Sequence, residues 1–181
     1  MSKIYAHISG YPGSGKTTLS IELNERYDDI AVKDTDDFME GIDPSLPFEK
    51  INKIMKYKLD TFIKKNANKK VVLVGFFTLL DKTEYKFFLN TSLEISSKRV
   101  VARLLNDSER RHKFIINAYR EADKSDKNFC NFVKNYLNYK HIMLENKYLK
   151  NSYLRQGYKI IGIQQILNFL DEKLTKRNRT K

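Results

Sequence analysis

Residues 10–17 read GYPGSGKT and match G-x-x-x-x-G-K-[ST] at every fixed position. Glycines at 10, 13 and 15 let the backbone turn tightly and approach a ligand without a Cβ in the way. The N–H groups of such a loop converge on phosphate oxygens, assisted by the N-terminus of the helix that follows. The stretch predicts a nucleotide-binding loop whose contact residues are Gly10, Gly13, Ser14, Gly15, Lys16, Thr17 and Thr18.

The flanks of this loop agree with the motif. Residues 3–9 are short, apolar and partly β-branched, which predicts a buried strand. Residues 18–25 carry Leu19 and Leu23 at helical spacing. A strand, a loop and a helix in this order are the context that the motif requires, with Lys16 reaching the β- and γ-phosphates and the Thr17 hydroxyl ligating Mg²⁺.

Strands and helices alternate along the rest of the chain. We expect a parallel, five-stranded α/β sheet with helices on both faces and right-handed crossovers. Ligands of such sheets bind at the carboxyl ends of the strands. The further strands are predicted at 30–33, 71–74, 85–90 and 157–162, and the helices at 48–65, 93–105, from 114 to about 153 with a break near 123–126, and 163–174.

Length and composition set the class of protein. The 181 residues suit one domain, with no apolar stretch long enough to span a bilayer. The single Cys130 excludes an internal disulfide, so we expect a soluble, cytoplasmic protein without a membrane partner. The net charge of +12 indicates either a polyanionic partner or a compositional bias, because the lysines are spread along the chain. The oligomeric state is not predicted.

Three carboxylates follow the second predicted strand. If residues 34–37 are extended, Asp34 and Asp36 share one side and Asp37 faces the other. One carboxylate could take a proton from an acceptor hydroxyl while another holds Mg²⁺, and the expected metal ligands are Thr17 and Asp34. The alternative is an Asx turn or a helix cap before Phe38.

A basic segment follows the fourth strand. Arg99 and Arg103 are four residues apart and therefore lie on one helical face. Together with Arg110 and Arg111 they could form a lid, at about 106–113, that closes over ATP and binds its phosphates. The alternative is an ordinary solvated helix, and the basic residues 175–181 are expected to be a frayed tail.

The chain resembles the P-loop nucleoside and nucleotide kinase superfamily, most closely the uridine kinase and nicotinamide riboside kinase type. The resemblance rests on residues 8–18, 32–38, 72–76 and 87–89 with the arginine-bearing helix after them. It implies a three-layer P-loop kinase fold over residues 1–181 and ATP- and Mg²⁺-dependent transfer of a γ-phosphate to a nucleoside or nucleotide. The resemblance maps the catalytic base to Asp36, and the expected catalytic residues are Lys16, Asp36 and Arg103, with substrate contacts at Asp34, Asp37 and Phe38.

Two features depart from that family. Val74 stands where those kinases have an acidic residue, for which Asp34 or Asp81 could substitute. The lid also lacks a clean R-x-x-R. The aromatic residues Phe38, Phe76, Phe77 and Tyr57 could stack on an acceptor base, although core packing is the favoured role for any single one.

Two other functions remain open. A nucleic-acid 5′-hydroxyl kinase also combines such a loop with a downstream pair of aspartates, and the charge of +12 would suit its acceptor. A nucleotide-binding module without an acceptor is the second. The absence of N-K-x-D disfavours a GTPase.

Overall fold

The computed structural model describes residues 4–43, 45–76, 83–121 and 126–178. Contacts divide the chain into two compact units. The first, here called the sheet unit, comprises residues 1–10, 15–90 and 153–181, and the second, called the helical unit, comprises residues 11–14 and 91–152.

The sheet unit is built on five parallel strands in the order β2-β3-β1-β4-β5. The carboxyl ends of the three strands on one side are level, because Val74 is the register partner of both Ile8 and Asp34. The predicted five-stranded parallel sheet is therefore confirmed. The strands are β1 (Ile4–Ser9), β2 (Ile30–Asp34), β3 (Lys70–Val74), β4 (Thr83–Leu89) and β5 (Lys159–Ile161).

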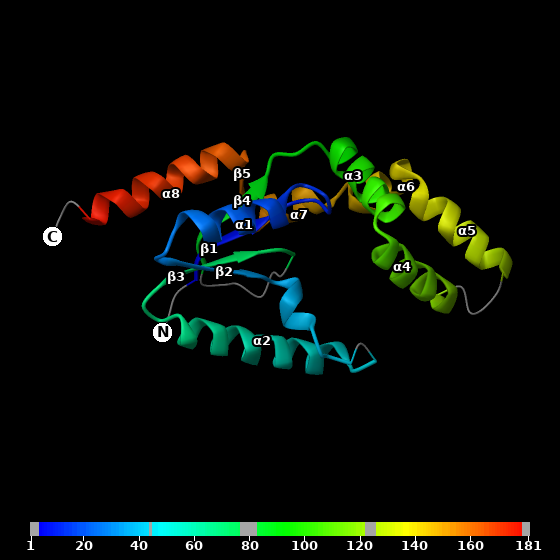
Figure 1. The fold of residues 1–181 in the computed structure, drawn as a ribbon, viewed down its shortest axis with the longest axis horizontal. Coiled ribbons are helices and arrows are strands. Elements are labelled where there is room, and N and C mark those ends of the chain that lie inside the picture. Colours follow the sequence, from blue (N-terminus) through cyan, green and yellow to red (C-terminus); the bar gives the residue numbers. More distant parts are fainter. Residues whose placement is uncertain (1–3, 44, 77–82, 122–125, 179–181) are drawn as a thin grey trace. The chain divides into compact units, whose positions relative to one another are not determined.

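Helices cover both faces of this sheet (Figure 1). Helices α1 (Lys16–Arg26) and α8 (Ile163–Asn178) pack on one face, where Leu23 and Leu170 are buried in the larger core. Helix α2 (Phe48–Lys65) places Met55 and Leu59 on the other face. Apolar spacing of three and four residues along each helix produces these faces, and the predicted bounds of α2 are those observed.

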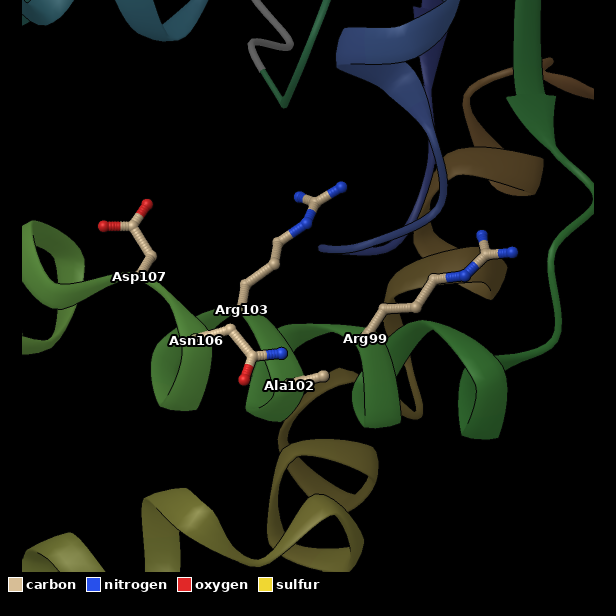
Figure 2. Close-up of a pocket in the computed structure, with 5 residues that line it drawn as sticks. All are labelled: Arg99, Ala102, Arg103, Asn106 and Asp107. Carbon is tan, nitrogen blue, oxygen red and sulfur yellow. The ribbon is translucent and has the colours of Figure 1, made fainter.

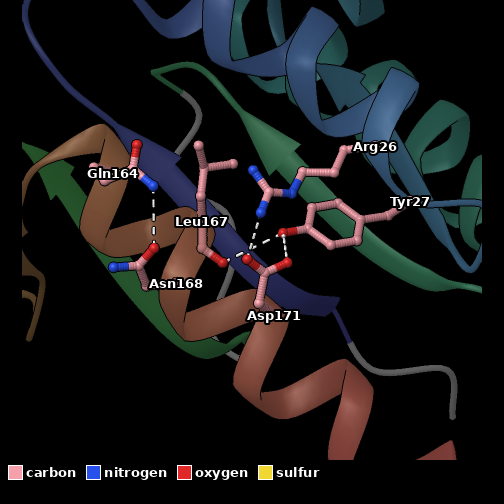
Figure 3. Close-up of polar contacts among 6 residues, drawn as sticks. All are labelled: Arg26, Tyr27, Gln164, Leu167, Asn168 and Asp171. Atoms are coloured by element: carbon pink, nitrogen blue, oxygen red, sulfur yellow. Dashed lines mark hydrogen bonds and ion pairs between the residues drawn. The ribbon is translucent and has the colours of Figure 1, made fainter.

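Hydrogen bonds and an ion pair connect α8 with the end of α1 (Figure 3). The Asp171 carboxylate accepts from Arg26 Nη2 at 2.5 Å and from the Tyr27 hydroxyl at 2.6 Å. Burial, followed by the hydrogen bond to Asp171, raises the pKa of Tyr27 above its ordinary value. One carboxylate thus joins two segments that are far apart in the sequence.

The helical unit has α3 packed against α6 and α4. Beyond the predicted break near 123–126, the helix expected to run to about residue 153 is interrupted at Asn138 and at 147–148, so that part of the prediction is wrong. Asn138 caps α6 by accepting from the backbone N–H of Lys140 at 3.1 Å, as its short polar side chain favours. The helices of the helical unit are α3 (Leu93–Asn106), α4 (Ser108–Glu121), α5 (Asp126–Leu137), α6 (Tyr139–Asn146) and the start of α7 (Leu149–Arg155).

Several predicted boundaries shift. Residues 36–39 form a short 3-10 helix, η1 (Asp36–Met39), so the extended geometry considered for 34–37 is not adopted and the turn given as its alternative is. Helix α8 runs to Asn178, so the first part of the expected frayed tail is helical. The expected lid at 106–113 is helical apart from the turn at Asp107. Within the described residues, no helix is long and apolar enough to cross a membrane.

Candidate functional site

The phosphate loop has the backbone that its glycines predict. Gly13 and Gly15 have φ values of 80° and 99°, which is the left-handed region that favours glycine. Helix α1 begins at Lys16, and no described side chain caps its N-terminus. Its first turn also lacks acidic residues. The first N–H groups and the positive end of the helix dipole therefore suit an anion such as a phosphate group.

Gly13 is also required by close packing within the helical unit. A Cβ built at Gly13 would lie 2.4 Å from the carbonyl oxygen of Ser96 in α3. On the same side, Thr91 Oγ1 donates to the carbonyl oxygen of Ser14 at 2.9 Å. Loop residues 11–14 are thus held by the segment that carries the predicted arginines.

Lys16 is held in place by two contacts within the sheet unit. Its Nζ donates to the carbonyl oxygen of Gly10 at 3.0 Å and lies 4.3 Å from the centre of the Phe76 ring. The Tyr153 hydroxyl in turn donates to the carbonyl oxygen of Phe76 at 2.6 Å. Phe76 therefore contacts the lysine directly, a role that differs from the predicted stacking on an acceptor base.

The three aspartates after β2 have different environments. Asp34 Oδ1 accepts from the backbone N–H of Asp36 at 3.0 Å, which is the Asx turn that the sequence left as an alternative. Asp37 pairs with Lys33 at 2.6 Å. The predicted alternation of sides fails because η1 winds the chain at these residues.

Asp36 has the electrostatics of a proton acceptor. Asp36 is an exposed residue, but the protein around its carboxyl group excludes part of the water there. This desolvation raises the pKa of Asp36 above its ordinary value. Repulsion from Asp34 and Asp37 acts in the same direction, and Lys16 opposes it. A carboxylate with a raised pKa is a stronger base near neutral pH.

The turn after β3 is fixed by Gly75. Its φ is 145°, and an added Cβ would lie 1.9 Å from Thr35 Oγ1. Its N–H donates to Ile8 at 3.0 Å, and the Thr35 N–H donates to Val74 at 2.8 Å, which joins the ends of β1, β2 and β3. Val74 is buried, so at this level of the sheet the carboxylate comes from its register partner Asp34. Phe77 and Asp81 lie outside the described residues.

The structure separates the predicted lid arginines into two pairs. Arg99 and Arg103 extend from the same side of α3 and line a pocket of about 330 Å³ with Ala102, Asn106 and Asp107 (Figure 2). Arg99 Nη1 lies 3.5 Å from the carbonyl oxygen of Gly13. By contrast, Arg110 pairs with Asp107 at 3.0 Å and Arg111 donates to Leu105 at 2.8 Å. The first pair is therefore the better candidate for phosphate contacts.

The remaining predicted residues vary in exposure. Thr17 and Thr18 are exposed at the start of α1, whereas Ser14 is buried. Phe38 is buried in the core beside α2 and contacts the Phe62 ring edge-on, so its side chain has the core position and not that of a substrate contact. Tyr57 is 73% exposed on α2.

A buried histidine near the loop was not predicted as part of the site. His7 is fully buried on β1, and its Nδ1 forms a hydrogen bond with the Tyr158 hydroxyl. Burial is the main reason that the pKa of His7 falls to about 3, and the charges of Lys86 and Lys16 lower it further. Tyr153 and Tyr158 reach this region from far along the sequence, so no local pattern could have identified them.

A magnesium ion would find oxygen ligands here. Within the described ranges, no group of three or more His, Cys, Asp or Glu side chains is arranged so that it could hold a metal ion by itself. The Thr17 hydroxyl and the Asp34 carboxylate are hard oxygen donors of the kind that Mg²⁺ prefers. Two protein ligands suffice for this ion, because phosphate oxygens and water usually supply the rest.

Two solved structures are similar to different shares of this chain. A chain in a solved Pnkp1/Rnl/Hen1 complex is 22% identical with a TM-score of 0.29, covering 41% of this chain and 27% of that one. A shikimate kinase from Bacteroides thetaiotaomicron is 17% identical with a TM-score of 0.48, covering 95% of this chain and 98% of that one. No curated protein matches the sequence.

A family model gives the assignment. The model described as an AAA domain, AAA_18, matches residues 7–126. This span contains the phosphate loop, the three aspartates and α3 with Arg99 and Arg103. The match covers more than half of the chain, and the protein therefore belongs to the AAA_18 family of AAA domains.

Proposed function

We propose that this protein is an ATP- and Mg²⁺-dependent kinase that transfers the γ-phosphate to a nucleoside or nucleotide. The observation that carries the proposal is that β1 and β2, whose carboxyl ends are level across β3, lead directly into the phosphate loop and into Asp34 and Asp36. The charge of Lys16 also acts on the carboxylate of Asp36. A phosphate-binding lysine and a candidate base within one electrostatic environment suit phosphoryl transfer better than nucleotide binding alone.

Each group then has a defined task. The loop N–H groups and the start of α1 bind the phosphates, and Lys16 exchanges its contact with Gly10 for phosphate oxygens. Asp36 accepts the proton of the acceptor hydroxyl as that oxygen forms a bond to the γ-phosphorus. The bond from the γ-phosphorus to the β–γ bridging oxygen breaks, and ADP leaves. Arg99 and Arg103 bind oxygens of the transferring group through their planar forks.

Magnesium bound to Thr17 and Asp34 would supply charge neutralisation at the phosphates. Asp34 is suited to hold it because its Oδ1 is already oriented by the backbone N–H of Asp36. In this assignment Asp34 is the metal ligand and Asp36 is the base.

A nucleic-acid 5′-hydroxyl kinase is the second candidate function. It would use the same groups and differ only in the acceptor. The net charge of +12 supports it, because a polyanionic acceptor is attracted to a basic protein. Screening ATP consumption with nucleosides, nucleoside monophosphates and a 5′-hydroxyl oligonucleotide separates the two.

Asp36→Asn tests the proposed role of the base. We expect kcat to fall by roughly 10²- to 10⁴-fold, because a positioned base contributes about that much, while ATP affinity stays within a few-fold. In the unchanged protein, kcat should decline when acidification protonates Asp36, because protonated Asp36 cannot accept a proton.

Asp60→Asn is the matched control, since Asp60 is exposed on α2. It should leave kcat unchanged. Lys16→Ala should weaken both ATP binding and turnover. Near-normal turnover of Asp36→Asn with the preferred acceptor would exclude Asp36 as the base.

A further inference from the structure

The helical unit has a groove that the proposed chemistry does not use. It has a volume of about 540 Å³ and lies between the start of α3 and helix α6. Its apolar wall consists of Leu93, Met143 and Leu144, and Leu144 is 62% exposed. This volume is within the range of about 300–1,000 Å³ that is typical of small-ligand sites.

Cations and aromatic rings border this apolar wall. Tyr139, Lys140 and Lys147 line the groove from α6 and the turn after it. The ammonium of Lys98 lies 5.1 Å from the centre of the Tyr139 ring. Beside the groove, Lys147 lies 4.6 Å from the centre of the Tyr148 ring, which is 68% exposed.

The charge balance of the groove is positive. Glu94 is the acidic residue of the lining, and it is paired with Lys98 at 2.6 Å. That ion pair leaves the charges of Lys140 and Lys147 to set the sign of the potential at the rim. An anionic ligand is therefore favoured over a cationic or neutral one.

We propose that this groove binds a segment of single-stranded nucleic acid. Bases would stack on Tyr139 and the apolar wall, while backbone phosphates would lie near Lys140 and Lys147. Aromatic platforms combined with lysines are the pattern with which proteins hold single strands, and every base has a face that can stack. The net charge of +12 adds attraction for a polyanion.

This site is independent of catalysis. Binding in the groove requires neither ATP nor Asp36, so it can be measured without turnover. The groove would be useful to a kinase of either acceptor class. It would localise the protein on nucleic acid, or it would hold the strand that is phosphorylated.

The test is the binding of a 5′-fluorescent oligothymidylate of about twelve nucleotides, a length within the usual site sizes. Fluorescence anisotropy is measured between about 50 and about 200 mM salt. The variants are Tyr139→Leu and the pair Lys140→Glu with Lys147→Glu. The control pair, Lys53→Glu with Lys56→Glu, makes the same charge change at exposed positions of α2. Thermal melting checks that each variant is folded.

We expect the groove charge reversal to weaken binding by at least about tenfold and to reduce the salt slope by about 1.4, since each phosphate contact contributes about 0.7. Tyr139→Leu should weaken binding by roughly 5- to 150-fold, the range expected for the loss of one stacked base. The salt slope should stay unchanged. The control pair should have a much smaller effect than the groove pair.

Three results would overturn the proposal. The wild-type protein could fail to bind the oligonucleotide, or the two charge-reversed pairs could weaken binding equally. The third result has two parts: an oligoglutamate peptide binds with the same dependence on Lys140 and Lys147, and Tyr139→Leu leaves oligonucleotide binding unchanged. Together these would indicate an acidic protein partner.

Assays of ATP binding and phosphoryl transfer on the same preparations separate this proposal from the proposed function. A protein that binds the oligonucleotide through the groove but transfers no phosphate would refute the kinase alone. An active kinase whose oligonucleotide binding ignores all groove variants would refute the groove alone.

Discussion

The contact between Lys16 and Phe76 leads to a prediction about nucleotide affinity. Lys16 Nζ lies 4.3 Å from the centre of the Phe76 ring and also donates to Gly10. To reach the β- and γ-phosphates, the ammonium must leave the ring. Phe76→Leu removes the aromatic face and retains an apolar side chain, and the backbone carbonyl that accepts from Tyr153 remains.

The magnitude follows from the burial of the pair. A cation over an aromatic ring contributes about 0.5–1 kcal/mol at exposed sites and about 2 kcal/mol when desolvated. Phe76 and Lys16 are both half-buried, so about 1 kcal/mol is reasonable. Because this interaction stabilises only the nucleotide-free position of the lysine, its loss should tighten ATP binding by about fivefold.

Calorimetric titration with ATP and Mg²⁺ measures this effect. Phe76→Tyr is the control, because it keeps the aromatic face and should bind ATP like the unchanged protein. The variants Phe76→Leu and Lys16→Met also form a double-mutant cycle. If Phe76→Leu weakens ATP binding, or has the same effect when Lys16 is already Met, the reasoning is refuted.

Two further predictions concern stability. Asp171→Asn should lower the free energy of unfolding by about 1 kcal/mol, a value discounted for the partial exposure of Asp171. It removes the negative charge that pairs with Arg26 and that accepts a hydrogen bond from the Tyr27 hydroxyl. An unchanged urea midpoint would contradict this prediction. His7 has a pKa near 3 when folded and near 6.5 when unfolded, so its contribution to stability is present above about pH 6.5 and is lost as the pH falls toward 3. Urea unfolding from pH 6.5 to 4.5 should show a shallower decline for His7→Gln, by up to about 1.4 kcal/mol per pH unit, and parallel curves for the two proteins would exclude this role.

The sequence predicted those parts of the fold that depend on local spacing. Helix α2 was found at its observed bounds because Met55, Leu59 and Ile63 repeat at helical intervals. The parallel sheet followed from alternating apolar runs. The phosphate loop was recognisable because each of its fixed positions answers a chemical requirement of phosphate binding.

Other parts of the site depend on local alternatives of similar stability or on contacts between residues far apart in the sequence. Helix η1 begins where the Asp34 carboxylate accepts a hydrogen bond from the backbone N–H two residues later. This turn conformation competes closely with an extended chain. The contacts of Phe76 with Lys16 and Tyr153 join residues about 60 and 77 positions apart. Interruption of the long helix required the cap at Asn138, whose residue type also occurs within helices.

The central place of β1 in the sheet has a consequence for biosynthesis. Residues 4–9 emerge from the ribosome well before 70–74 and 83–89, the two segments that flank them in the sheet. Until those segments are made, β1 is an apolar strand with both edges unpaired, which is a site for aggregation or chaperone binding. Pairing across such sequence separations also slows folding, because the entropy of closing a long loop must be overcome first. Translation pauses before residue 70 should therefore promote aggregation of this protein more than pauses within its C-terminal helix.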